Sequence, residues 1–211
     1  MRHRHTLLGT MLMTVALLTT VGPAHATASQ HGPTHLPSAV VSPPAFSDGS
    51  FEEPTAPSGG FTTVVVGQSI GPWTVTRGSV DLIGAGFWAA ADGDQSVDLS
   101  GVQAGTVTQS FATNPGTRYL VSYALAGNPN GLPLIKTGQV RVNGTDVQDF
   151  TFDVGGKSTA DMGYVTQSFQ FVASYQLTTL SFVSTTSSAY GPVLDGVSVT
   201  AICCSTCDSE V

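Results

Sequence analysis

From Phe46 onward the chain alternates apolar and polar residues in short runs, and no stretch shows the period of an amphipathic helix. Gly, Pro, Asp and Asn separate the runs, as turn residues do between strands. Half-buried strands are therefore expected at residues 61–66, 73–76, 80–83, 96–99, 106–111, 119–125, 140–142, 150–152, 169–171, 180–182 and 193–200. Many short strands without helices predict an all-β fold in which two sheets pack into a jelly-roll β-sandwich.

Two local features agree with this prediction. Asn143 and Gly144 lie between β-prone residues, and both residue types accept the positive φ that a two-residue hairpin turn requires. Trp73 begins a strand directly after a Gly-Pro pair, and large aromatic side chains at such positions usually fill the core of a sandwich. We expect a hairpin at residues 143–144 and a buried Trp73.

Acidic residues stand at both ends of the strand-rich region, within residues 48–53 at the front and 190–195 at the back. In a jelly roll the first and last strands lie side by side, so these carboxylates are expected to meet and share one Ca²⁺ ion. Glu52 and Asp195 are the predicted ligands, Asp48 is a weaker candidate, and the ion would have a structural role. The alternative is that Glu52 and Asp195 are ordinary edge carboxylates, one capping a turn and the other hydrogen-bonded to neighbouring backbone N–H groups.

The segments outside the strand-rich region differ in composition. Residues 1–26 have the pattern of a secretory signal peptide, with a basic start, an apolar run from Leu7 to Val21 and an Ala-His-Ala cleavage pattern. Residues 27–45 are expected to form a Pro-rich disordered linker, residues 46–201 the sandwich, and residues 202–211 a tail. The apolar run is too short for a membrane span and no second one follows it, so a secreted protein is expected.

The charge of the chain limits its partners. Once the signal peptide is removed, five basic residues remain against fourteen acidic ones, which gives a net charge of −9. Such a surface disfavours nucleic acid and anionic lipid. It suits neutral polymers, cationic partners or calcium.

Residues that commonly carry catalysis are scarce. The region from residue 46 onward contains no histidine, which removes the commonest general base and histidine-ligated metals. Glycoside hydrolysis needs two carboxylates at a defined separation, and none of the acidic residues stands in a recognisable catalytic motif. A non-catalytic protein is expected.

Several motifs, taken in order, resemble one bacterial family. They span Asp48 to Glu53, Pro72 to Val75, Gly78 to Asp81, Phe87 to Gly93, Ser96 to Leu99, Gly127 to Pro129 and Tyr190 to Asp195. This set resembles the choice-of-anchor C family of secreted proteins, which is itself similar to the plant cell-wall proteins grouped as domain of unknown function family 642. The resemblance implies a galactose-binding-like β-sandwich, of the kind found in many carbohydrate-binding modules, and an association with cell-wall polysaccharide.

Sugar recognition needs aromatic faces for the C–H surface of a sugar ring and polar groups for its hydroxyls. Phe87 and Trp88, in a Gly- and Ala-rich stretch typical of a loop, form the predicted platform. Tyr164 and Tyr190 flank other turns and would extend it. Polar partners are predicted at Asn128, Asn130 and Lys136. Core filling is the alternative for each aromatic side chain. The primary prediction is a secreted module that binds cell-wall or environmental polysaccharide.

Three cysteines, Cys203, Cys204 and Cys207, follow the last expected strand. Exposed thiols of an exported protein become oxidised, so a local disulfide with one spare thiol, or a disulfide-linked dimer, is expected. Three ligands without a fourth disfavour zinc. These cysteines support an alternative function, an extracellular structural or adhesion protein that acts through protein–protein contacts and disulfides.

Overall fold

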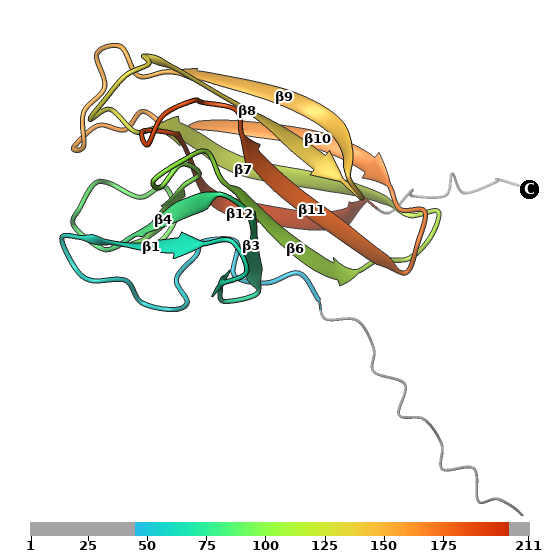
Figure 1. Cartoon of the computed structure of the whole chain (residues 1–211). Coiled ribbons are helices and arrows are strands. Elements are labelled where there is room, and N and C mark those ends of the chain that lie inside the picture. Colours follow the sequence, from blue (N-terminus) through green and yellow to red (C-terminus); the bar gives the residue numbers. More distant parts are fainter. Residues whose placement is uncertain (1–44, 203–211) are drawn as a thin grey trace, which may run out of the picture. The chain divides into compact units, whose positions relative to one another are not determined.

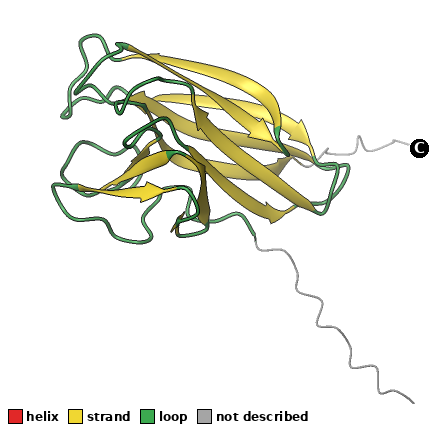
Figure 2. Cartoon of the chain, viewed as in Figure 1, coloured by secondary structure: helices red, strands yellow, loops and turns green. Residues whose placement is uncertain are grey.

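The computed structural model describes residues 45–202, which form two antiparallel six-stranded sheets without helices (Figures 1 and 2). The first sheet runs in the order β1 (Phe61–Val65), β4 (Ser79–Ile83), β5 (Ser96–Asp98), β12 (Pro192–Ile202), β7 (Arg118–Gly127) and β10 (Val165–Val172). The second runs β2 (Ser69–Ile70), β3 (Trp73–Arg77), β6 (Thr106–Ala112), β11 (Leu177–Ser184), β8 (Ile135–Val142) and β9 (Thr145–Asp153). The predicted all-β sandwich is confirmed.

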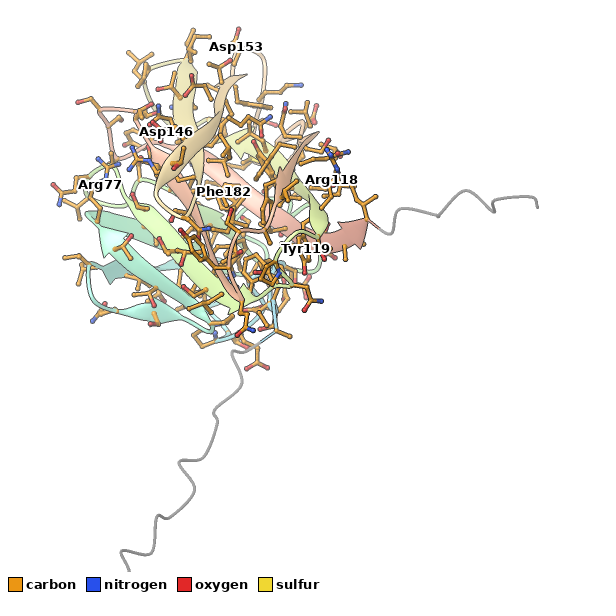
Figure 3. All side chains as sticks on the ribbon, turned by 90° about the vertical axis from the view of Figure 1, so that its right-hand side faces the viewer. Arg77, Arg118, Tyr119, Asp146, Asp153 and Phe182 are labelled. Carbon is orange, nitrogen blue, oxygen red and sulfur yellow. The ribbon has the colours of Figure 1, made fainter. Side chains whose placement is uncertain are left out.

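The core lies between the two sheets and is built from the inward residues of the alternating strands. In β7, for example, Val121, Tyr123 and Leu125 are buried while the residues between them are half-buried. The ring of Tyr123 meets that of Phe182 on β11 edge to face, with centroids 5.0 Å apart. Charged side chains such as Arg118 and Asp153 lie at the periphery (Figure 3).

Trp73 is fully buried, as the sequence predicts. Its ring lies against Phe51 and Phe182, with centroid distances of 5.3 Å and 6.1 Å. Its indole N–H donates to the carbonyl of Asp48 at 2.8 Å. The side chain thus ties the segment before β1 to the second sheet.

The predicted hairpin at Asn143-Gly144 is also confirmed. Both residues have positive φ, 50° and 79°, and they connect β8 directly to β9, where Val142 pairs with Thr145. This conformation is accessible to Gly without steric cost and to Asn at a small one. The sequence therefore sets the register of this strand pair locally.

The predicted adjacency of the first and last strands is wrong. β1 pairs with β4 at the edge of the first sheet, whereas β12 lies between β5 and β7 in its middle. The irregular segment before β1 reaches β12 instead, and the backbone N–H of Val197 donates to the carbonyl of Gly49 at 2.9 Å. The two acidic ends do approach each other, but through this segment and not through a strand pair.

Several predictions concern residues that the structure does not describe. The signal peptide at residues 1–26, the linker up to residue 44 and the tail cysteines Cys203, Cys204 and Cys207 lie outside the described range. Within residues 45–202, no helix is long and apolar enough to cross a membrane.

Candidate functional site

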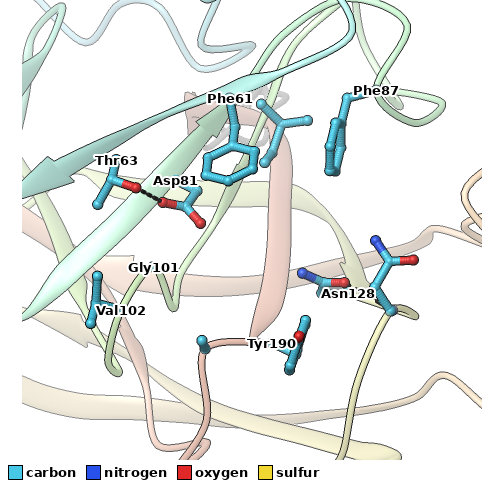
Figure 4. Close-up of a pocket in the computed structure, with 11 residues that line it drawn as sticks. Phe61, Thr63, Asp81, Phe87, Gly101, Val102, Asn128 and Tyr190 are labelled. Atoms are coloured by element: carbon cyan, nitrogen blue, oxygen red, sulfur yellow. Dashed lines mark hydrogen bonds between the residues drawn. The ribbon is translucent and has the colours of Figure 1, made fainter.

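A cavity of about 330 Å³ opens beside β1 and β4, within the size range of small-molecule sites. Strands supply Phe61, Thr63, Asp81 and Ile83 to its wall. Loops between later strands supply Phe87, Val102, Asn128, Asn130 and Tyr190 (Figure 4). Segments far apart in the sequence therefore form one concave site.

Three aromatic rings line this cavity. Phe61 is 48% exposed and meets the half-buried Phe87 edge to face, with centroids 5.6 Å apart. Tyr190 is 40% exposed and lies across the cavity from Phe61 (Figure 4). Apolar ring surface is thus presented to the cavity from two sides.

The polar groups of the cavity are one carboxylate and two amides. Asp81 is half-buried, and its Oδ1 accepts a hydrogen bond from the Thr63 hydroxyl at 2.6 Å. Burial raises the pKa of this carboxyl above its ordinary value, while the Thr63 hydrogen bond lowers it. Asn128 is almost fully buried at the cavity wall, whereas Asn130 is exposed.

A fully buried carboxylate, Asp98, holds the side chain of Asn128 in place from the protein interior. Its Oδ2 accepts from Asn128 Nδ2 at 2.7 Å, and its Oδ1 accepts from the N–H groups of Ser100 and Gly191 at 2.9 Å and 3.0 Å. Burial raises the pKa of Asp98 to about 7, although these three hydrogen bonds counteract it. Gly191 follows Tyr190 in the chain, so Asp98 holds both loops that bring Asn128 and Tyr190 to the cavity.

The loop that carries Asn130 is held from inside by Lys136. The Lys136 side chain is fully buried, and its Nζ donates to the carbonyl of Gly131 at 2.7 Å. Burial lowers the pKa of Lys136, and the charge of Asp98 raises it. A Cβ on residue 131 would lie 2.2 Å from the Tyr190 ring, so only glycine permits this close contact. Lys136 therefore holds the loop that carries Asn130 from the protein interior, and it does not line the cavity.

The structure brings together some of the predicted binding residues and separates others. Phe87, Asn128, Asn130 and Tyr190 line the cavity. Trp88 and Tyr164 do not. Phe61 and Asp81 were not predicted. The available signal for Phe61 was its position as an aromatic residue beside two threonines at the exposed start of a strand. Nothing in the local pattern distinguishes Asp81 from other surface acids.

Trp88 is buried, and the platform prediction needs correction at this residue. Only 5% of Trp88 is exposed, and its indole N–H donates to Ser96 Oγ at 2.8 Å. Its ring supports Phe87 edge to face, with centroids 5.2 Å apart. Tyr164 is half-buried, and its hydroxyl is buried without a hydrogen-bond partner among the described residues. Burial raises the pKa of that hydroxyl. Trp88 thus belongs to the hydrophobic core, and Tyr164 packs against it.

Two of the acids proposed as metal ligands hold the loop that carries Phe87. Glu52 Oε1 accepts from the N–H groups of Asp94 and Gln95, both at 2.9 Å. Asp195 Oδ2 accepts from the N–H groups of residues 91 and 92 at 2.7 Å and 3.0 Å. Both carboxylates therefore accept hydrogen bonds from backbone N–H groups of one loop, a role that needs no cation.

Asp48, the third proposed ligand, is different. Its Oδ1 accepts from the backbone N–H of Glu52 at 2.9 Å, but its Oδ2 is buried and has no hydrogen-bond partner within the described residues. Burial raises the pKa of this carboxyl. No three His, Cys, Asp or Glu side chains gather into a metal-binding group anywhere in residues 45–202.

Halomucin of Haloquadratum walsbyi is 27% identical over 139 residues, which cover 65% of this chain but only 1% of halomucin. Among solved structures, the CBM35 from Paenibacillus barcinonensis matches with 22% identity and a TM-score of 0.43, covering 67% of this chain and 99% of that one. A family 35 carbohydrate binding module from Clostridium thermocellum matches with 16% identity and a TM-score of 0.47, with the same two coverages.

The sequence model of one protein family matches most of the chain. The match runs from residue 44 to residue 200 and so includes both sheets, apart from the last two residues of β12, and every residue of the cavity wall. The chain belongs to the family described as protein of unknown function, DUF642.

Proposed function

We propose that the protein is a secreted, non-catalytic module that binds polysaccharide in the cavity between Phe61 and Tyr190. The observation that carries this proposal is the combination of three aromatic rings with two amides and one carboxylate in a concave site. Sugar rings present apolar C–H faces and hydroxyl edges, which match aromatic and polar groups respectively. The loops that hold these groups are fixed by buried hydrogen bonds, so little ordering is required when a ligand binds.

The cavity lacks the pair of carboxylates that glycoside hydrolysis uses. Among its lining residues, all of them within the described range, Asp81 alone is acidic. Both retaining and inverting glycosidases need two carboxyl groups facing the scissile bond. This supports binding without catalysis.

The secreted location is part of the proposal and depends on the signal peptide pattern of residues 1–26. The membership in the choice-of-anchor C group and the association with a cell wall also stay predictions. Purification of the protein from culture medium and from washed cell walls, followed by N-terminal sequencing, would locate it. A mature N-terminus near Thr27 is expected.

Replacing Tyr190 by alanine is expected to weaken retention on the polysaccharide at least tenfold, because a central aromatic contact is lost while the fold persists. The measurement is affinity electrophoresis or a pull-down on cellulose, pectin, xylan, chitin and peptidoglycan. Tyr175→Ala is the matched control, since Tyr175 is 64% exposed and lies between β10 and β11, away from the cavity lining.

Failure of the wild-type protein to bind any polymer in this panel would contradict the proposal. The adhesion function, with disulfides at Cys203, Cys204 or Cys207, would then be tested by non-reducing electrophoresis. Equal loss of binding in Tyr190→Ala and Tyr175→Ala would place the binding surface elsewhere.

Calcium binding stays a prediction, and Asp48 supports it better than Glu52 or Asp195 because its Oδ2 is buried without a partner. We expect calcium in large excess over its Kd to raise the free energy of unfolding by about 3 kcal/mol relative to chelator. Asp48→Asn should remove this difference, since asparagine keeps an acceptor for the Glu52 N–H but loses the charge. Thermal melts in calcium and in chelator measure the effect, and identical wild-type melts would rule out the ion.

A further inference from the structure

We propose that the cavity selects glycans that carry a protonated amine. This inference rests on the proposed function and names the ligand class of the same site. Asp81 is the only charged residue among the described residues that line the cavity. Its Oδ1 accepts a hydrogen bond from Thr63, whereas its Oδ2 has no hydrogen-bond donor among residues 45–202 and faces the cavity (Figure 4). A ligand therefore meets an unpaired carboxylate oxygen.

No basic side chain of the described region lines the cavity to balance Asp81. Arg77 lines a neighbouring hollow, but its guanidinium donates to the carbonyls of Gly105 and Ser184. Lys136 is buried on Gly131, and Arg141 pairs with Asp146 at 2.6 Å. An acidic sugar such as a uronate would bring a second negative charge beside Asp81 without a counter-charge.

The aromatic rings favour the same class of ligand. A cation gains electrostatic energy over the face of an aromatic ring, and this gain increases when water is excluded. Phe61, Phe87 and Tyr190 line the same cavity as Asp81 (Figure 4). An amino sugar offers both an apolar ring face for these side chains and an ammonium group for the carboxylate.

The net negative charge of residues 45–202 also favours cationic ligands, and it acts over longer distances than Asp81 does. Residues 45–202 contain twelve acidic and five basic residues. A surplus of negative charge raises the local concentration of cationic ligands and speeds their association at low salt. A polymer with many protonated amines would benefit more than a single sugar.

The test compares oligosaccharides of equal length by calorimetric titration at about pH 5.5, because the neighbouring oxygens of glucosamine hold the pKa of its amine below that of an ordinary amine. Glucosamine oligomers (chitosan type) are expected to bind at least tenfold more tightly than the N-acetylated oligomers (chitin type), because a charge-assisted hydrogen bond is added. Oligogalacturonides are expected not to bind. Added salt should weaken binding of the amine oligomers more than that of the acetylated ones.

Asp81→Asn removes the charge and keeps an oxygen that accepts the Thr63 hydroxyl. It should abolish the preference for the amine, so that free-amine and acetylated oligomers bind the variant with affinities within about twofold of each other. Asp161→Asn is the control, because it removes one charge from an exposed residue that does not line the cavity. Thermal melts of both variants establish that they are folded, and the salt dependence of the wild type tests the proposal independently of either substitution.

Three results would overturn the inference. They are equal affinity for acetylated and free-amine oligomers, an amine preference unaffected by Asp81→Asn, and an amine preference unaffected by salt. In each case the protein still binds the oligosaccharides and the proposed function stands, with its place in the cavity tested separately by Tyr190→Ala. Absence of binding to all three oligomers and to the polysaccharide panel would overturn the proposed function as well.

Discussion

Trp73→Ala is expected to lower the free energy of unfolding by about 3–5 kcal/mol, the range typical of large-to-small aromatic substitutions in a core. Trp73 is fully buried and touches Phe46 and Phe51 from the irregular N-terminal segment as well as Phe182 from β11. Alanine would leave a cavity at the junction of these elements. Urea denaturation followed by circular dichroism measures the loss.

Trp73→Phe separates the two contributions of this side chain. Phenylalanine keeps most of the ring contacts but cannot donate to the carbonyl of Asp48, which would be left partly buried without its partner. We expect a loss of about 1–3 kcal/mol for this variant, smaller than for alanine. Tyr175→Ala, at an exposed position, should change the free energy of unfolding by less than about 0.5 kcal/mol. A Trp73→Ala variant as stable as Tyr175→Ala would contradict this role.

The strands were predictable because the alternation that marks them is local. Residues 119–125 show the period clearly, and β7 lies there. β2 was not predicted, because Ser69–Ile70 is too short to display any period. The order of the strands was less accessible, since pairing between β12 and β7 depends on contacts across the chain and not on local pattern.

The site was predictable only in part, and the limit lies in the loops. Phe87 and Trp88 are neighbours in a loop without periodicity, so the sequence does not show which ring faces outward. The structure decides this through Ser96, which binds the indole of Trp88 in the interior. Asp81 reaches the cavity because β4 lies beside β1. The sequence of residues 79–83 alone does not indicate that pairing.

The roles of Glu52 and Asp195 show the same limit. The sequence correctly predicted that the two acidic ends lie close together. It did not indicate that these carboxylates accept hydrogen bonds from backbone N–H groups within residues 91–95. Those donors belong to a third segment, the loop between β4 and β5. The ends of the domain therefore position the loop that carries Phe87, and calcium at these two residues stays untested.

The stability of the domain is expected to fall as pH rises from 5 to 8, because burial raises the pKa of two carboxyls, Asp98 and Asp195, to about 7. Burial raises the pKa of Asp98 to about 7 in the folded protein, compared with about 3.9 in an unfolded chain. Between these values the folded state binds more protons than the unfolded state, so the stabilisation is complete below about pH 4 and is lost as pH approaches 7. From pH 5 to pH 7 the loss from Asp98 is about 2 kcal/mol, because the slope of 1.36 kcal/mol per unit falls to half as pH reaches the folded pKa.

Asp98→Asn tests this linkage, because asparagine cannot ionise. The variant is expected to be less stable than the wild type at pH 5, since its NH₂ group would face the amide donor of Asn128. Its free energy of unfolding should nevertheless change less between pH 5 and pH 8 than that of the wild type. Urea denaturation in chelator across this range measures the slope, and Asp94→Asn, at an exposed position, serves as the control. Equal slopes in Asp98→Asn and the wild type would show that Asp98 is ionised in the fold at pH 5, so that the three hydrogen bonds from Asn128, Ser100 and Gly191 outweigh its burial.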